Sequence, residues 1–391
     1  FFNWASNQND GAFQHLPLSC KIMGSILSRC GFLMEAEALL SRNEIQGVLP
    51  DCGEIFSNLI EGYLREFDFD KAIAVYEKMR GIQLMPFLSA SQALIEYSVE
   101  LDESRMAYSV YKDMMIHFEM GRLLVAEKSI HEKVIRLLCL HGRVREAREL
   151  VMKAMVEYGT RPSHSVTLSL TRCYCGKKDY DDLFGFFFEA KVSPDFIIGN
   201  RILFSVCQNL GVDQGDIYLQ KLEDLRFSPD SISLGILIGF SCRESKLKRA
   251  MFYISEILSR GLEPHLYSYN ALLSGIIKEG MWFHYREMLS EMYDSEITPN
   301  LSTFRIVLAG LCKARRFDEM KAIVIEMSER NLIELSPFDD PLSEGFLILG
   351  LDPLDVKIRR DNGKSLYKAE FFDSLGNGLY LDTNLDEFDR K

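Results

Sequence analysis

The residue types that most often carry catalysis occur in this chain without catalytic spacing. The seven histidines form no HExxH pair or comparable arrangement, so exposed or packed histidine is the better interpretation of each. Cys173 and Cys175 make one CxC pair, but no second pair with the spacing of a zinc site follows. The segment DTNLDEFD looks like the start of a calcium loop, but Glu387 stands where that loop needs glycine. The sequence therefore predicts no enzyme, no metal site and no cofactor.

The charge and hydropathy of the chain narrow the classes of binding partner. A net charge of −12 argues against a uniformly basic surface for nucleic acid. The acidity is uneven, since residues 336–391 carry 12 acids against 7 bases, whereas residues 231–335 carry 13 of each. No apolar run approaches the roughly 20 residues that a membrane span requires. We expect neither a membrane nor a small-molecule substrate as a partner.

A period of 35 residues organises most of the sequence. The windows 196–230, 231–265 and 266–300 follow one another without insertion or deletion and end in SPD, EPH and TPN. The same frame extends to windows 17–51, 53–87 and 301–335, and windows 88–127, 128–163 and 164–195 keep the pattern but vary in length. A short repeat cannot bury its apolar residues alone, so neighbours must stack. We expect an all-α, right-handed α-solenoid of about nine helix-turn-helix repeats.

The window 266–300 shows why each repeat should hold two helices. Apolar residues from Tyr269 to Ile277 follow the spacing of one helix face, and those from Tyr285 to Met292 repeat it. Gly280 can take the left-handed conformation that ends the first helix, and Pro299-Asn300 stops the second.

Two rows of equivalent residues test this frame. Ala36, Ala72, Ala107, Ala147 and Ala250 share a position in the second helix, where a small side chain allows close stacking, whereas Leu183, Tyr285 and Met320 depart from it. Five cysteines share a position late in the first helix, and buried packing explains them best: Cys139, Cys175, Cys207, Cys242 and Cys312. Unpaired core cysteines also suit a reducing compartment.

The repeat resembles the pentatricopeptide repeat of plant proteins. The segments FSNLIEGYLREFDFDKAIAVYEKM, LYSYNALLSGIIKEG and LSTFRIVLAGLCKARRFDEM look like that family, whereas the tetratricopeptide repeat has a period of 34 and other signature offsets. The resemblance covers about residues 17–335. Residues 1–16 look like a leader segment, and the acidic residues 336–391 resemble a partly irregular spacer of members that continue into further repeats.

The resemblance implies single-stranded RNA as the partner, read at one base per repeat by the fifth and last residues. The resemblance associates the pair of Asn200 and Asp230 with uracil. It associates the pair of Asn270 and Asn300 with a pyrimidine, cytosine preferred. Ser57 and Gly235 occupy the fifth position of two other windows. Apolar or aromatic residues at the second position could stack between bases: Ile197, Ile232 and Tyr267. Cations at the thirteenth position could hold phosphates: Arg29, Arg65, Arg243, Lys278 and Lys313.

Other windows depart from this code, and structural roles compete with the binding roles. The pairs without a clear base are Lys21 with Asp51, Ser57 with Phe87, Glu132 with Ser163, Leu168 with Asp195, Gly235 with His265, and Arg305 with Leu335. Asp51, Asp195, Asp230 and Asn300 each precede a first helix, where they could serve only as caps. The cations could form a solubilising face.

The expected function is that of a non-enzymatic adaptor that binds single-stranded RNA in organellar RNA processing, stability or translation. The resemblance implies a mitochondrial location, with the chloroplast second and the targeting peptide outside this chain. The alternative is a protein-binding scaffold or a structural subunit of an organellar ribonucleoprotein, with RNA-processing or ribosomal proteins as partners. The weak code in residues 53–195 and the acidic tail favour that alternative.

Overall fold

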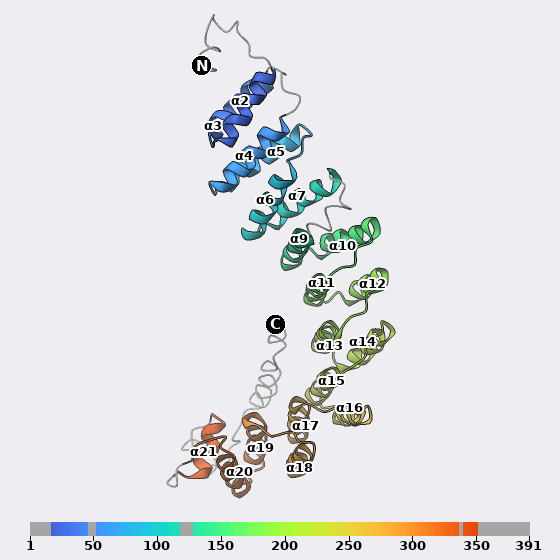
Figure 1. Ribbon diagram of the computed structural model, residues 1–391. Helices are drawn as coiled ribbons and strands as arrows, with labels where there is room; N and C mark the ends of the chain where they lie inside the picture. Colours follow the sequence, from blue (N-terminus) through green and yellow to red (C-terminus); the bar gives the residue numbers. More distant parts are fainter. Residues whose placement is uncertain (1–16, 46–51, 118–127, 336–338, 351–391) are drawn as a thin grey trace, which may run out of the picture. The chain divides into compact units, whose positions relative to one another are not determined.

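The computed structural model describes residues 17–45, 52–117, 128–335 and 339–350, and within these residues every regular element is a helix (Figure 1). None of these helices is long and apolar enough to cross a bilayer. The leader expected at residues 1–16, Asp51 and the DTNLDEFD segment lie outside the described residues. The domain boundaries at residues 16 and 335 stay predictions.

The chain divides into two compact units between Lys177 and Lys178. In the first unit, the first helices of the repeats are α2 (Pro17–Arg29), α4 (Gly53–Arg65), α6 (Leu88–Glu100), α9 (Lys128–Leu140) and α11 (His164–Lys177). The second helices are α3 (Leu33–Ile45), α5 (Phe69–Gly81), α7 (Ser104–His117) and α10 (Val144–Tyr158). Each first helix packs against the next one, from α2 to α11.

The second unit begins with α12 (Tyr180–Ala190), the second helix of window 164–195. Its first helices are α13 (Phe196–Leu210), α15 (Ser231–Arg243), α17 (Leu266–Lys278) and α19 (Leu301–Lys313). Its second helices are α14 (Val212–Asp224), α16 (Leu247–Ser259), α18 (Tyr285–Asp294) and α20 (Phe317–Glu329), with the 3₁₀ turn η1 (Trp282–His284) before α18. A last helix, α21 (Pro341–Ile348), packs against α20.

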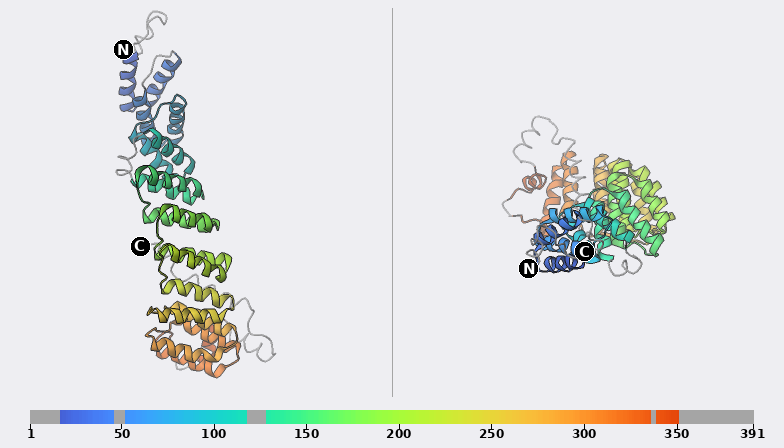
Figure 2. Two further views of the ribbon diagram at one scale, coloured as in Figure 1. Left: turned by 90° about the vertical axis from the view of Figure 1, so that its right-hand side faces the viewer. Right: turned by 90° about the horizontal axis from the view of Figure 1, so that it is seen from above.

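All nine first helices in the described residues begin at the first residue of a predicted window. The predicted all-α helix-turn-helix repeat is therefore confirmed, and Figure 2 shows the hairpins of the second unit stacked side by side. The hand of the superhelix stays a prediction.

Helix ends follow the predicted turn chemistry. Gly280 ends α17 with φ +81°, in the left-handed region that glycine tolerates. Asn300 caps α19, because its side-chain oxygen accepts a hydrogen bond from the Thr303 N–H at 3.0 Å. Other windows place a non-glycine residue in the equivalent turn, such as Ser245 with φ +59°, so glycine is not obligatory there.

The row of small residues lies in the core, as predicted. Ala36, Ala72, Ala107, Ala147 and Ala250 are each fully buried, and so are the larger residues at the same position in other windows. The prediction for the cysteines holds for Cys175, Cys207, Cys242 and Cys312, which are buried. Cys139, at the same position, is only partly buried, so the prediction does not hold fully for it.

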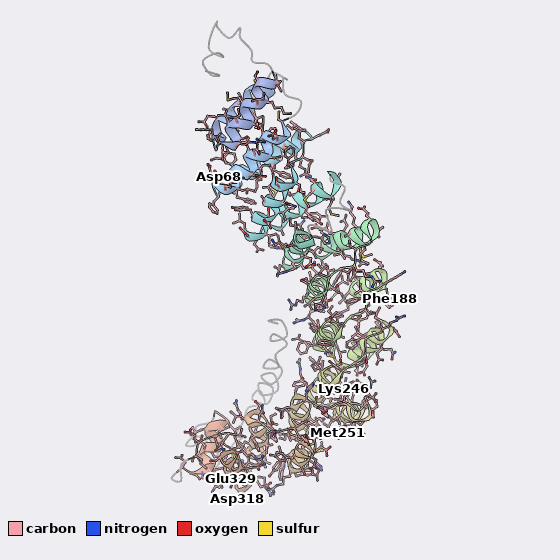
Figure 3. All side chains as sticks on the ribbon, viewed as in Figure 1. Asp68, Phe188, Lys246, Met251, Asp318 and Glu329 are labelled. Atoms are coloured by element: carbon pink, nitrogen blue, oxygen red, sulfur yellow. The ribbon has the colours of Figure 1, made fainter. Side chains whose placement is uncertain are left out.

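Second helices of neighbouring repeats are joined by tyrosine–carboxylate hydrogen bonds and by ion pairs. The Tyr76 hydroxyl donates to Asp113 at 2.6 Å, and the Tyr285 hydroxyl donates to Glu319 at 2.9 Å. Lys246, labelled in Figure 3 with Met251 of the same hairpin, pairs with Asp213 of the preceding repeat at 2.8 Å. A partly buried hydrogen bond to a charged group contributes roughly 1.5–3 kcal/mol, so the two tyrosine bonds reinforce the stacking of repeats. The Lys246–Asp213 pair is exposed and screened by water, so it contributes little.

A buried histidine makes the stability of the first unit depend on pH. The Nδ1 atom of His131 lies 2.6 Å from the Tyr111 hydroxyl, and burial lowers the pKa of His131 to about 4. In the unfolded chain the pKa returns to about 6.5, so the unfolded state gains protons first and stability falls as the pH drops from about 6.5 towards 4. Between about pH 7.5 and pH 5, wild type should lose about 2 kcal/mol more unfolding free energy than His131→Gln.

Urea titrations at the two pH values, followed by circular dichroism, measure this difference. The exposed residue His164 offers the matched control, since His164→Gln should behave as wild type does. Equal losses in wild type and His131→Gln would show that His131 does not titrate with unfolding.

Candidate nucleic-acid interface

The expected reading residues of the second unit lie at the starts of consecutive first helices. Asn200 lies in the second turn of α13, and Asp230 is the residue immediately before α15. Because α13 packs against α15, the fifth residue of one window and its last residue reach each other across the boundary between two repeats.

The side chains of Asn200 and Asp230 are hydrogen-bonded. The amide Nδ2 of Asn200 donates to the two carboxylate oxygens of Asp230, at 3.2 and 3.4 Å. Its Oδ1 accepts from the Ser233 hydroxyl at 2.5 Å. Asp230 also caps α15 by accepting from the Ser233 N–H at 2.8 Å. The pair therefore joins two repeats and caps a helix.

Asn270 occupies the equivalent position two repeats later in a different local network. It is 4% exposed, and its Oδ1 is buried with no hydrogen-bond partner among the described residues. The Ser233 hydroxyl lies within hydrogen-bond distance of both Asp230 and Asn200, at 2.9 and 2.5 Å, whereas the equivalent Thr303 hydroxyl donates to Asn300 at 3.1 Å. A buried acceptor without a partner costs about 1–3 kcal/mol, so the Asn270 amide is less favourably held than the Asn200 amide.

Ser57 and Gly235 have structural roles at their positions. The Ser57 hydroxyl donates to the Gly53 carbonyl at 2.7 Å and accepts from the Phe87 N–H at 2.8 Å, and the residue is 1% exposed. A Cβ atom added to Gly235 would lie 2.9 Å from the Ser268 hydroxyl, so the absence of a side chain permits close helix packing. Their predicted role in base reading stays a prediction.

The expected stacking residues, Ile197, Ile232 and Tyr267, are each half-exposed. They lie at the second residue of α13, α15 and α17. Ile232 also packs against the core of its unit. Partial exposure leaves apolar surface that a base could cover.

The five cations of the thirteenth position all lie in the last turn of a first helix, namely Arg29, Arg65, Arg243, Lys278 and Lys313. A cation there stabilises the helix by interacting with the negative end of its dipole, whether or not RNA is bound. All five side chains are exposed, which leaves them accessible to phosphate.

The two units differ in how these cations are neutralised. Arg29 pairs with Glu54 at 2.6 Å and Arg65 pairs with Glu61 at 3.2 Å, both in the first unit. In the second unit, Arg243 lies over the Phe240 ring, and Lys278 donates to the Arg243 carbonyl at 2.8 Å. Neither of these two pairs with an acid in the part of the chain that the structure describes. The second unit therefore keeps more uncompensated positive charge along this row.

Sequence reasoning did not identify Ser233 and Thr303 as parts of the site. Each hydroxyl accepts a hydrogen bond from the backbone of the capping residue three positions earlier, which makes a capping box at the start of α15 and α19. A capping residue followed three positions later by serine or threonine is the sequence signal that could have identified Ser233 and Thr303. In the described ranges, no group of three or more acidic, cysteine or histidine side chains could hold a metal ion.

The fold and this row of helix starts define a helical repeat protein whose repeats present equivalent residues at regular intervals. Residues 264–313 match the PPR repeat family, and residues 54–84 and 302–332 match the PPR repeat. The chain belongs to the pentatricopeptide repeat family of plant proteins.

A curated relative is the mitochondrial pentatricopeptide repeat-containing protein At5g15280 of Arabidopsis thaliana. It is 47% identical over 391 residues, which is all of this chain and 32% of the relative. A second Arabidopsis thaliana relative, mitochondrial protein At5g61990, is 24% identical over 179 residues, or 41% of this chain and 18% of that protein. The chain thus spans about a third of the first relative and less of the second.

Two solved structures have a similar arrangement. The pentatricopeptide repeat protein PPR10 from maize is 14% identical, with a TM-score of 0.37 over 97% of this chain and 67% of that one. Yeast Rmd9p, solved with a 16-nt target RNA, is 12% identical, with a TM-score of 0.42 over 95% of this chain and 83% of that one.

Proposed function

We propose that this chain binds single-stranded RNA along its first helices, with one base facing each repeat and the best-defined reading in windows 196–230 and 266–300. The observation that carries the proposal is the recurrence of a buried asparagine amide at the same repeat position. Asn200 is held by Asp230 and Ser233, and Asn270 has an unused acceptor. An amide both donates and accepts, which suits the Watson–Crick edge of a pyrimidine.

The assignment of bases follows the chemistry of the two pairs. Asp230 fixes the Asn200 amide, and this pair is assigned to uracil. An amide oxygen can accept a hydrogen bond from the exocyclic amine of cytosine, so Asn270 with Asn300 is assigned to cytosine. The window between them has Gly235 at the fifth position and is assigned no base.

Backbone contacts come from the thirteenth position. Arg243 and Lys278 lie at the ends of adjacent first helices and have no acidic partner in the described part of the chain. Spacing by one repeat gives one cation for each nucleotide step. The net charge of −12 does not oppose this, because phosphate contact depends on local charge.

In this proposal the chain acts as an adaptor without catalysis of its own, in mitochondrial RNA processing, stability or translation. Binding would protect or remodel a transcript, and proteins of RNA processing would supply the chemistry. The relative with 47% identity is a mitochondrial protein, which supports this location over the chloroplast.

Selection from a random RNA pool at moderate salt tests the function. We expect enrichment of uracil and cytosine separated by one unspecified base. Retention of RNA without any enriched motif would leave only backbone binding, and no retention would favour the alternative role as a protein-binding scaffold or ribosomal subunit.

A further inference from the structure

Three consecutive first helices of the second unit carry a buried hydroxyl at their third residue, namely Ser233 of α15, Ser268 of α17 and Thr303 of α19. Because each of these helices packs against the preceding first helix, its third residue can reach the fifth residue of the window before. Ser233 is hydrogen-bonded to Asn200, and the Ser268 hydroxyl lies 2.9 Å from the place where a side chain on Gly235 would begin. The third position therefore belongs to the surroundings of the expected reading residue.

The Ser233 hydroxyl takes part in two structures at once. Its Oγ accepts from the Asp230 N–H at 3.2 Å, which completes the capping box of α15. Asp230 Oδ1 already accepts from the Ser233 N–H and from the Asn200 amide. The hydroxyl proton of Ser233 is therefore placed on its shorter contact, the one of 2.5 Å to Asn200 Oδ1.

Together, Asp230 and Ser233 select one orientation of the Asn200 amide. An asparagine side chain has two orientations of similar shape, which exchange the places of its oxygen and its nitrogen. In the orientation observed, Nδ2 donates to Asp230 and Oδ1 accepts from Ser233. The reverse orientation would place the amide oxygen against the Asp230 carboxylate.

The equivalent threonine does not hold its asparagine in this way. The Thr303 hydroxyl donates to Asn300 at 3.1 Å, and the Oδ1 of Asn270 is buried with no hydrogen-bond partner among the described residues. The two windows thus share the capping box but differ in the contact from the hydroxyl to the fifth residue.

We propose that Ser233 is a positioning residue that sharpens the uracil preference of window 196–230, an inference that rests on the proposed RNA-binding function. At C4, uracil has a carbonyl acceptor where cytosine has an amine donor. A free amide oxygen attracts the amine and repels the carbonyl, so it favours cytosine. The Ser233 hydroxyl occupies the Asn200 oxygen and thereby removes this advantage of cytosine.

Two matched alanine variants separate positioning from capping. Ser233→Ala and Thr303→Ala each remove the hydroxyl of a capping box, but only Ser233→Ala also removes a hydrogen bond to a reading asparagine. We expect Ser233→Ala to lower the preference for uracil over cytosine about fivefold, which is the effect of one ordinary hydrogen bond. Thr303→Ala should leave the cytosine preference of its window unchanged. Competition binding with RNAs that differ at one position measures both preferences.

The side-chain amides report positioning without RNA. In protein labelled with nitrogen-15 asparagine, the Asn200 and Asn270 amide signals are assigned by their loss in Asn200→Ala and Asn270→Ala. We expect hydrogen exchange of the Asn200 amide to quicken by roughly threefold or more in Ser233→Ala. Exchange of the Asn270 amide should not change in Thr303→Ala.

The two measurements separate the failure of this proposal from the failure of RNA reading. Unchanged exchange of the Asn200 amide in Ser233→Ala would show that Ser233 does not position it, which overturns the proposal whatever RNA is bound. Equal loss of base preference in both alanine variants would assign the effect to capping, and an unchanged uracil preference in Ser233→Ala would leave the hydroxyl no part in specificity. Absence of any base preference in wild type would instead overturn the proposed function, and this inference with it.

Discussion

Replacing both Asn200 and Asn270 with alanine is expected to lower discrimination between bases at two RNA positions by roughly tenfold or more each, as loss of a base-edge contact predicts. The reason is that alanine offers neither the donor nor the acceptor of the amide. Overall affinity should fall less, because the cations that contact the backbone are unchanged. Competition binding with RNAs that differ only at the two positions measures the effect.

The control for this prediction is an amide outside the reading position. Asn58 lies one residue after the fifth position of its window and donates to Ser28 at 3.3 Å, so Asn58→Ala removes a comparable bond between repeats. It should leave base preference unchanged. The helix signal in circular dichroism should persist in both variants. Unchanged discrimination in the Asn200/Asn270 variant would mean that these amides only join repeats.

Replacing both Arg243 and Lys278 with alanine is expected to weaken binding of every RNA to a similar degree. Each lost phosphate contact lowers the slope of log affinity against log salt by about 0.7, which near 0.15 M salt corresponds to about fourfold in affinity. Two contacts therefore predict a loss of about 15-fold. Binding isotherms at several salt concentrations measure both quantities.

The first unit supplies the matched control. Arg29 and Arg65 occupy the same repeat position but pair with Glu54 and Glu61. Replacing both with alanine should change affinity and salt slope less than the Arg243/Lys278 variant does. If the two double variants lose affinity equally, the uncompensated cations of the second unit have no special part in binding.

The period of 35 residues was sufficient to predict the fold. Each first helix in the described residues starts where a window starts, because the same apolar spacing recurs from repeat to repeat. The Asn300 cap and the left-handed Gly280 follow from local chemistry that a single window displays. Such features depend on neighbours within a few residues, so a sequence displays them directly.

Features that depend on contacts between repeats were not predictable. Asn200 and Ser57 hold their polar atoms inside the interface between repeats, and only the packing of first helices decides which partners they meet. The division of window 164–195 between two units has no counterpart in the sequence pattern.

The most direct test of base reading is to change one reading pair into the other. Asn300→Asp turns the pair of window 266–300 into a copy of Asn200 with Asp230, and aspartate caps α19 as well as asparagine does. Pool selection with wild type and this variant should show the cytosine preference at one position shifting to uracil, with the other position unchanged. An identical motif from both proteins would contradict the account.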